Sequence, residues 1–473
     1  MTSDAGPADG GQAGWREILG RQHRASLVIV GLGVWLHAAD GLLVATMLPA
    51  IVAGIGGVSL MPWTIALYEI GSITAGAASG LMALRLGLRR PMALAALLFA
   101  AGCVLSALAP AMWVLLVGRL LQGFGGGGLA ALSFVSVTRL FPPRLMGRVM
   151  AIISTVWGVS ALTGPLIGGL FVELATWRLG FLCFALQAVL LAAWLMTRAE
   201  PATGDAGDAR GQRFPAIRLL WLALGVVAVA YAGIRIGPLH TPAFVLAGLA
   251  CLACFLWLDA AAPTGRLLPQ HPIGLATPVG AALTMLLAFA AATIAIGVYV
   301  PFLLTSLHGV SPLVAGYLIA LESIAWSVGA TVVSGSPERR DGRMIVTGLG
   351  MVTLSILGLA WSVPFGPLWL VGASAILQGL GFGMAWTFIL RRAAAVARPG
   401  EQALVAAAIP TVQRLGYALG AAYVGIVANA AGLEDDPTTL ARTGLIVFLA
   451  CLPLAAIGLV AAARFTRAEP GIA

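Results

Sequence analysis

Long apolar segments alternate with short polar or basic loops along most of the chain. Each segment holds about 20 residues, the length that crosses a bilayer as a helix. We predict fourteen such spans, near 27–53, 60–83, 91–109, 112–138, 148–172, 179–197, 217–236, 242–260, 275–304, 312–334, 344–363, 367–390, 402–430 and 442–464. Because the apolar runs are continuous rather than alternating, they indicate helices and not the strands of a membrane barrel. The sequence therefore predicts an all-α integral membrane protein.

The middle of the chain leaves the number of spans open. The segments near 217–236 and 242–260 are the weakest, and without them the chain would have twelve spans and a long central linker. We favour fourteen because residues 219–234 and 242–258 carry no charge and a short Gly-Pro turn separates them.

Composition supports the membrane interpretation. The 473 residues are 60% hydrophobic and only 10% charged, whereas soluble proteins carry roughly 25% charged residues. The net charge of +9 comes from arginines scattered among short loops, so we expect a bilayer and not nucleic acid as the partner. Cys251 and Cys254 form a C-x-x-C inside an apolar run, and with no second pair or nearby histidine we predict no metal site.

The positions of the arginines predict an orientation. If the N-terminus is cytoplasmic, 22 of the 27 arginines fall in cytoplasmic tails and loops. Such a bias is typical of the cytoplasmic side of membrane proteins. We therefore predict a multi-pass protein of a bacterial inner membrane with both termini in the cytoplasm.

The two halves of the chain resemble each other at an offset of 254 to 256 residues. IALYEIGSITAGAASG at 65–80 matches IALESIAWSVGATVVSG at 319–335, and LQGFG at 121–125 matches LQGLG at 377–381. We predict two pseudo-symmetric six-helix bundles at 27–197 and 275–465, a linker at 198–216, two extra spans at 217–260, and tails at 1–26 and 466–473. Duplicated six-span halves are typical of transporters whose substrate site lies between the halves.

Ionisable residues at membrane depth are the candidates for function, because they are costly there and mark substrate pathways or proton relays. The sequence has seven: Asp40, Glu69, Arg119, Glu173, Arg235, Glu322 and Arg414. Fixed ion pairs that hold the halves together are the structural alternative. Burial disfavours an ionised carboxyl group and a nearby arginine favours it, so a carboxyl balanced between the two can load and release a proton. The residues predicted to couple to protons are Asp40, Arg119, Glu69 and Glu322.

Glu69 and Glu322 occupy matched positions in the repeat, and we expect them to face one cavity. The predicted substrate-binding residues are Glu69, Glu322, Tyr68, Trp326 and Gln122. Two further ionisable residues are predicted to act in gating. Glu173 pairs across the halves as an external gate or forms a surface pair with Arg178. Arg414 is a gate partner or a substrate anchor, whereas Arg235 extends to the outer interface.

Four motifs occur in order along the first half: DGLLVATMLP at 40–49, GLMALRLGLRR at 80–90, GRLLQGFGGGG at 118–128 and WGVSALTGPLIGG at 157–169. Together they resemble motifs of the Major Facilitator Superfamily, and in particular of its fourteen-span drug:proton antiporters. The resemblance implies gating or conformational roles for Gly80, Gly87, Arg89, Arg90, Gly123, Gly158, Gly164, Pro165, Gly168 and Gly169. One departure is Leu84, where the loop motif carries an aspartate that pins the outward-facing state.

These features predict a proton-coupled exporter of amphipathic or hydrophobic small molecules, working by alternating access. No ATP-binding segment is present, so we expect a proton gradient and no cofactor to drive it, with the small-molecule substrate, protons and lipid as its partners. We expect a monomer and no enzymatic activity. The alternatives are a lipid or metabolite transporter of the same fold, a solute:proton symporter, and a membrane receptor or scaffold that transports nothing.

Overall fold

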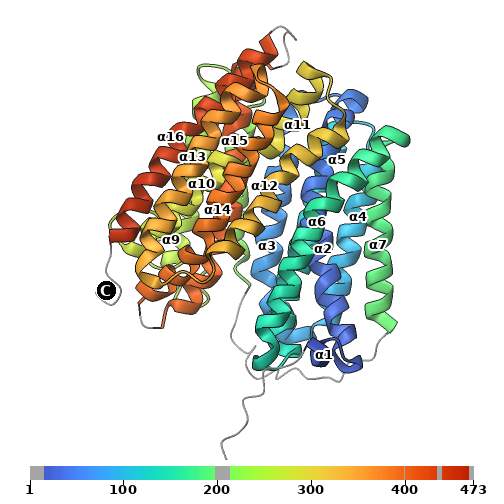
Figure 1. Cartoon of the computed structure of the whole chain (residues 1–473), viewed down its shortest axis with the longest axis vertical. Coiled ribbons are helices and arrows are strands. Elements are labelled where there is room, and N and C mark those ends of the chain that lie inside the picture. Colours follow the sequence, from blue (N-terminus) through green and yellow to red (C-terminus); the bar gives the residue numbers. More distant parts are fainter. Residues whose placement is uncertain (1–14, 198–213, 399, 434–438, 468–473) are drawn as a thin grey trace, which may run out of the picture.

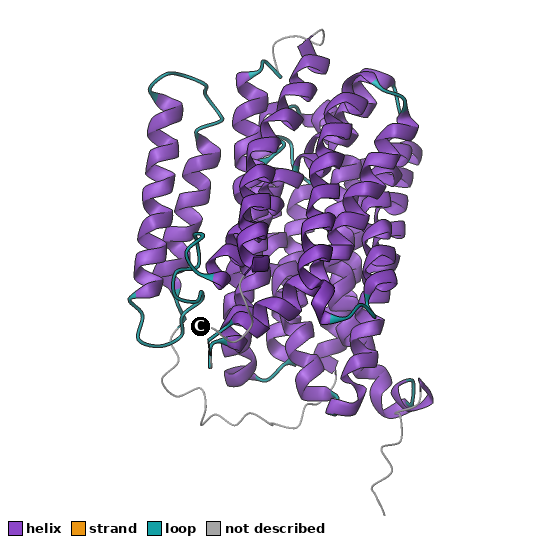
Figure 2. Cartoon of the chain, turned by 60° about the vertical axis from the view of Figure 1, so that its left-hand side comes forward, coloured by secondary structure: helices purple, strands orange, loops and turns teal. Residues whose placement is uncertain are grey.

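The computed structural model describes residues 15–197, 214–398, 400–433 and 439–467, and the regular elements in these ranges are all helices (Figure 2). The N-terminal helices are α1 (Trp15–Ile18), α2 (Arg21–Ile55), η1 (Val58–Leu60), α3 (Trp63–Leu86), α4 (Arg89–Ala107), α5 (Met112–Leu140), η2 (Pro143–Leu145), α6 (Met146–Leu174) and α7 (Trp177–Thr197). The later helices are α8 (Ala216–Tyr231), α9 (His240–Ala260), α10 (Pro278–Thr293), α11 (Ala295–His308), α12 (Pro312–Val333), η3 (Glu338–Arg340), α13 (Asp341–Phe365), α14 (Leu368–Val396), α15 (Gln402–Ala430) and α16 (Leu440–Arg467). The predicted all-α fold is confirmed.

Twelve helical segments of the described chain are long and apolar enough to cross a membrane, with α10 and α11 counted as one. The protein is therefore a multi-pass membrane protein. Two further helices coincide with predicted spans without belonging to these twelve. Helix α8 has only 16 residues, and α15 is interrupted by polar side chains such as Gln413 and Arg414. The count of fourteen spans stays a prediction.

The helices gather in two groups (Figure 1). Helices α2 to α7 pack against one another on one side, and α10 to α16 do so on the other. Helices α8 and α9 pack together, and α8 also contacts α15 and α3. The predicted bundle boundaries stay predictions, and most of the predicted linker at 198–216, together with the ends of both tails, lies outside the described residues.

Glycines let two pairs of helices approach closely. A Cβ built on Gly123 of α5 would lie 2.1 Å from the carbonyl oxygen of Tyr68 on α3. The same contact joins α14 to α12, where a Cβ on Gly379 would lie 2.0 Å from the carbonyl oxygen of Glu322. No side chain fits at these distances, so glycine is required at both crossings. One helix of each crossing carries an acid that the sequence analysis predicted to be functional: α3 carries Glu69, and α12 carries Glu322.

These two crossings correct the register of the repeat. The residue that meets the crossing glycine is Tyr68 in the first half and Glu322 in the second. Glu322 therefore corresponds to Tyr68 and not to Glu69, and the prediction that the two glutamates hold matched positions is wrong by one residue. One residue turns a helix by about 100°, so the two acids leave their helices in different directions.

The two groups of helices touch at the ends that lie away from the arginine-rich loops. A Cβ on Gly316 of α12 would lie 2.3 Å from Thr46 Oγ1 of α2, and one on Gly169 of α6 would lie 2.7 Å from the backbone of α12. At the same end of the interface, Asn429 Nδ2 of α15 donates to the carbonyl oxygen of Ser59 in η1, 3.2 Å away. These contacts close one end of the interface.

Two positions differ from the sequence analysis. Helix α8 ends at Tyr231, so Arg235 lies exposed in the loop before α9 and not within a helix, although the predicted span extended to residue 236. The chain turns there because Gly233 packs against α15, where a Cβ would lie 3.2 Å from Ile426, and because Gly-Pro follows. Helix α3 continues past Gly80 and ends before Gly87, whose φ of +76° suits glycine.

The crossing of α5 and α3 generates a stability prediction. We expect Gly123→Ala to lower the free energy of unfolding by about 1–3 kcal/mol, since the added methyl group overpacks the backbone of Tyr68. The matched control is Gly158→Ala on α6, where a Cβ meets nothing within 4 Å. Thermal unfolding of the purified variants in detergent measures both. Equal melting temperatures for the two variants would contradict the close crossing.

Candidate functional site

A buried ion pair joins α2 to α5. Arg119 Nη1 lies 2.6 Å from Asp40 Oδ2, and the two residues are 2% and 0% exposed. Arg119 Nε donates to the carbonyl oxygen of Thr64, 3.2 Å away. The guanidinium also lies over the ring of Tyr68, 4.4 Å from its centre. The arginine predicted at membrane depth is thus compensated by a carboxylate, a carbonyl and an aromatic face.

Gln122 completes the arrangement around Arg119. Its side-chain oxygen accepts a hydrogen bond from Arg119 Nη1, and its nitrogen donates to Ser106 Oγ, 3.1 Å away. Gln122 is completely buried, so in this arrangement its amide orients the arginine rather than facing a substrate. Asp40 Oδ1, by contrast, is buried and has no hydrogen-bond partner in the described part of the chain.

A second arginine connects the two groups of helices. Arg414 of α15 donates from Nη1 to Glu69 Oε2 of α3 at 3.0 Å. Its Nη2 lies 2.7 Å from His37 Nε2 of α2, and His37 Nδ1 lies 2.7 Å from Tyr68 Oη. Arg414 therefore holds the N-terminal group through both a carboxylate and an imidazole.

The acid of the second half has different partners. Glu322 Oε1 accepts from Gln378 Nε2 at 2.9 Å, and Gln378 Oε1 in turn accepts from Ser355 Oγ at 3.2 Å. Glu322 has no ion pair among the described residues. Gln378 takes the place in α14 that Gln122 takes in α5, but no arginine stands one turn before it. The second half thus carries a half-buried acid without a cation.

Aromatic side chains lie near Glu322. Trp326, one turn along α12, stacks on Phe382 with ring centroids 5.1 Å apart and meets Trp386 edge-on at 5.7 Å. Tyr417 of α15 lies in the neighbourhood of both Glu322 and Glu69. These rings supply an apolar surface beside an acid.

The other predicted residues divide into two sets. Gly164 and Gly168 let α6 lie against α2, where a Cβ on either would lie 3.0 Å from a carbonyl oxygen of α2, and Pro165 lies between them within the same helix. The rest lie toward the surface. Glu173 is exposed and forms no ion pair in the described chain, because the nearby Arg178 instead donates to the carbonyl oxygens of Ala107 and Ala109. Arg89 and Arg90 begin α4 at the basic turn.

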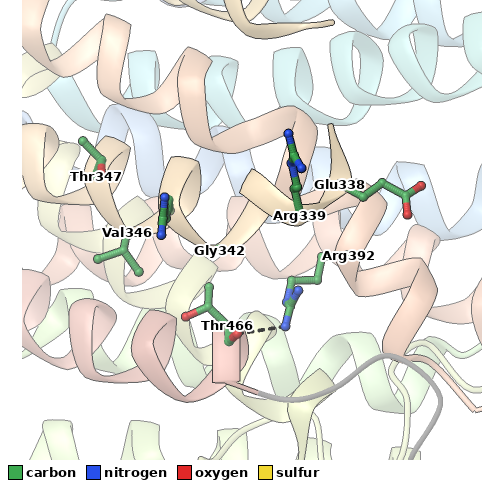
Figure 3. A pocket seen from close by; sticks show the side chains of 8 residues that line it. Glu338, Arg339, Gly342, Val346, Thr347, Arg392 and Thr466 are labelled. Atoms are coloured by element: carbon green, nitrogen blue, oxygen red, sulfur yellow. Dashed lines mark hydrogen bonds between the residues drawn. The ribbon is translucent and has the colours of Figure 1, made fainter. Parts of the chain in front are cut away.

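A pocket of about 740 Å³ lies elsewhere, between α13, α14 and the end of α16 (Figure 3). Its lining comprises Glu338, Arg339, Gly342, Arg343, Val346, Thr347, Arg392 and Thr466. Arg392 donates to the carbonyl oxygen of Thr466 at 2.9 Å, which ties α14 to α16. None of the residues predicted from the sequence lines this pocket.

The sequence analysis missed His37. Histidine at membrane depth is a recognisable signal, and His37 stands three residues before Asp40, on the same face of α2. Only the structure shows that this face meets an arginine of the other group of helices.

The protein is a multi-pass helical protein, and charged residues compensate one another where its two groups of helices meet. This arrangement is typical of secondary transporters. The Major Facilitator Superfamily profile matches residues 30–421, and the chain belongs to this family. The family identifies a membrane transporter and not an enzyme. The resemblance of the four motifs to the Major Facilitator Superfamily is confirmed.

Relatives of the chain include efflux proteins. Two Mycobacterium tuberculosis proteins, from strains CDC 1551 and H37Rv and each named a probable multidrug-efflux transporter, are 32% identical over 465 residues. The match covers 96% of this chain and 97% of theirs. The multidrug resistance protein Stp of M. tuberculosis H37Rv is 28% identical over 424 residues, 86% of this chain and 76% of its own.

Solved structures share the fold. A bacterial homologue of the human lysosomal transporter Spinster, inward-facing and unoccupied, has a TM-score of 0.67 at 16% identity and covers 96% of this chain and 99% of its own. The peptide transporter POT in complex with sulfate has a TM-score of 0.67 at 17% identity, and the match covers 97% of this chain and 98% of its own. At these identities the likeness concerns the fold alone.

The buried pair generates a second prediction about stability. Arg119→Met leaves Asp40 as a buried charge without a cation, which we expect to lower the free energy of unfolding by about 3–5 kcal/mol. The double variant Asp40→Asn/Arg119→Met removes both charges, and we expect it to recover most of this loss. Thermal unfolding of both variants in detergent measures the difference. A double variant less stable than the single one would contradict a compensated pair.

Proposed function

We propose that the protein is a proton-coupled exporter that exchanges protons for amphipathic or hydrophobic small molecules by alternating access. A proton gradient drives it without a cofactor, and the working unit is a monomer. Asp40 and Glu69 bind protons, and the exchange alternates between openings at the two ends of the interface. The observation that carries the proposal is the pairing of the two carboxylate oxygens of Asp40.

Asp40 has one oxygen paired with Arg119, and the other is buried with no hydrogen-bond partner among the described residues. An unpaired oxygen of a buried carboxylate is costly, and a proton on that oxygen removes the cost. Arg119 opposes the proton through its charge. These opposed effects suit a group that gains and loses a proton during a transport cycle.

The proposed alternation rests on the contacts between the two groups of helices. Close contacts at Gly316 and Asn429 lie at the end away from the arginine-rich loops. Arg414 adds its bonds to Glu69 and His37 on the same interface. A transporter with contacts gathered at one end can exchange them for contacts at the other by rocking one group against the other.

The proposed substrate class rests on the relatives and on Glu322. Several relatives are named as multidrug transporters or resistance proteins. Glu322 forms no ion pair with the described residues, and it lies one turn from the stacked ring of Trp326. An acid beside aromatic surface suits an amphipathic cation. A lipid or metabolite transporter of the same fold is the alternative.

Fourteen spans, two six-helix bundles and cytoplasmic termini in a bacterial inner membrane belong to the same proposal. All fourteen predicted ranges coincide with helices, and α8 and α9 pack as a pair. In the described chain, the arginine-rich turns between α3 and α4, α5 and α6, α12 and α13, and α14 and α15 connect alternate pairs of spans, and we assign their end of the molecule to the cytoplasm by the charge bias.

Asp40→Asn tests the coupling role. The amide still accepts from Arg119 but cannot ionise, so we expect proton-driven efflux from proteoliposomes to fall at least tenfold at matched protein levels, about 1.4 kcal/mol or more. Asp259→Asn is the matched control, because Asp259 of α9 also pairs with an arginine, Arg218 at 2.5 Å, away from the contact between the two helix groups. Wild-type efflux by Asp40→Asn would refute the role.

A cysteine at Pro238 tests the number of spans. Pro238 lies in the loop between α8 and α9, so an impermeant reagent should label it from outside the cell if both helices cross the membrane. With twelve spans it would be labelled only from the cytoplasm. The experiment requires a variant without the five native cysteines, and a cysteine at Gly147, beside the basic turn, serves as the cytoplasmic reference.

A further inference from the structure

His37 is held between the two groups of helices by one contact on each ring nitrogen. Nδ1 lies 2.7 Å from Tyr68 Oη of α3, and Nε2 lies 2.7 Å from Arg414 Nη2 of α15. The residue is only 7% exposed, and the ring of Trp157 meets the imidazole edge-on with centroids 6.0 Å apart. Both nitrogens are therefore engaged inside the protein.

The partner at Nε2 determines where the proton of the ring lies. A guanidinium has five hydrogen-bond donors and no acceptor, so Nε2 of His37 must accept from Arg414 through its lone pair. The proton of the neutral ring then sits on Nδ1 and is donated to Tyr68 Oη. A second proton on Nε2 would set two donors against each other and one cation beside another. His37 cannot hold that proton while Arg414 is in place.

The charged groups that face His37 come from four helices, and they leave no negative charge to balance an imidazolium. Asp40 of α2 is paired with Arg119 of α5 at 2.6 Å. Glu69 of α3 is paired with Arg414 of α15 at 3.0 Å. Tyr68, the partner at Nδ1, lies between His37 and Arg119 and carries no charge as a phenol. Each carboxylate is already matched by an arginine.

We propose that His37 is a proton-release site of the transport cycle. His37 binds a proton on Nε2 when Arg414 is withdrawn, and loses it to water when α15 brings Arg414 against α2. The lone pair that held the proton then accepts the hydrogen bond from Arg414, and no other covalent bond changes. The inference rests on the proposed proton-coupled transport and identifies a residue through which closing the interface expels a proton.

The position of Arg414 along α15 links proton release to closure. Toward the end away from the arginine-rich loops, the same helix contacts the N-terminal group again. A Cβ on Gly425 would lie 3.0 Å from Pro62, and Asn429 donates to the carbonyl oxygen of Ser59. Because one helix carries all these contacts, bringing the ends together also brings Arg414 onto His37.

The direction of the pH effect follows from the proton count. The closed arrangement binds one proton fewer at His37 than the arrangement with Arg414 withdrawn. Lowering the pH therefore favours withdrawal, and the ratio of the two populations changes at most about tenfold per pH unit for one proton.

Distances between spin labels on the two groups of helices test the proposal. Suitable sites are Leu174, at the end of α6, and Trp369, at the start of α14, which are 80% and 70% exposed at the end of the interface that closes. The labelled full-length protein, without its native cysteines, is placed in lipid nanodiscs. From about pH 8 to about pH 5, the range in which imidazole titrates, we expect the longer-distance population to grow.

Two variants assign this growth to His37. In His37→Gln the side-chain oxygen still accepts from Arg414 but takes up no proton, so we expect the growth to be lost. In Arg414→Gln the cation is gone, so we expect the longer-distance population already at high pH. Because the second variant leaves His37 intact, it keeps the test valid if His37→Gln folds poorly. Growth in His37→Gln equal to that of the parent, or no growth in the parent, would overturn the proposal.

Efflux measured on the same preparations separates this inference from the proposed function. Proton-driven efflux by the parent, with an unchanged pH response in His37→Gln, would overturn the role of His37 and leave the proposed function standing. Absence of proton-driven efflux in the parent would overturn the proposed function, and the role of His37 in transport with it. A pH response lost in His37→Gln, together with weaker proton-driven efflux, supports both.

Discussion

A guanidinium buried among membrane helices needs compensation, and much of the site is arranged to supply it for Arg119. A carboxylate, a backbone carbonyl, a side-chain amide and an aromatic ring surround this one cation. These groups reach it only because the helices that carry them cross closely, which requires glycine where α5 meets α3. The same need leaves Asp40 with one oxygen engaged and one that has no hydrogen-bond partner in the part of the chain that the structure describes. A structural requirement for charge balance thereby creates the position at which we propose that a proton binds.

The second arginine acts across the interface rather than within one group of helices. The side chain of Arg414 is 24% exposed, against 3% for Arg119, so it is less firmly enclosed by its surroundings. Its partners, Glu69 and His37, belong to the other group of helices. Separating the groups exposes this arginine and its partners without breaking the Arg119 pair. The molecule thus combines an ion pair within one group of helices with an ion pair that joins the two groups.

The two halves share a scaffold but differ in charge. Glycines on α5 and α14 make the same kind of crossing with α3 and α12, and a buried glutamine directly precedes the glycine on each. In the first half that glutamine accepts a hydrogen bond from an arginine, whereas in the second half Gln378 donates a hydrogen bond to Glu322. Since Glu322 corresponds in register to Tyr68, an acid stands in the second half where an aromatic ring stands in the first. The two halves therefore present different chemistry at these corresponding positions.

Hydropathy and motifs predicted the helices, the membrane setting, the family and the arginines and acids at membrane depth, because these follow from local composition. The pairings were decided by the tertiary structure: Arg119 and Asp40 lie 79 residues apart, and Arg414 and Glu69 lie 345 apart. No local pattern states which acid meets which arginine, or that Glu322 is shifted by one residue from the apparent repeat. His37 carries no fixed charge, so it was not among the ionisable residues that the sequence analysis selected as functional candidates. Its place depends on helix rotation and on the approach of α15, which only long-range packing determines.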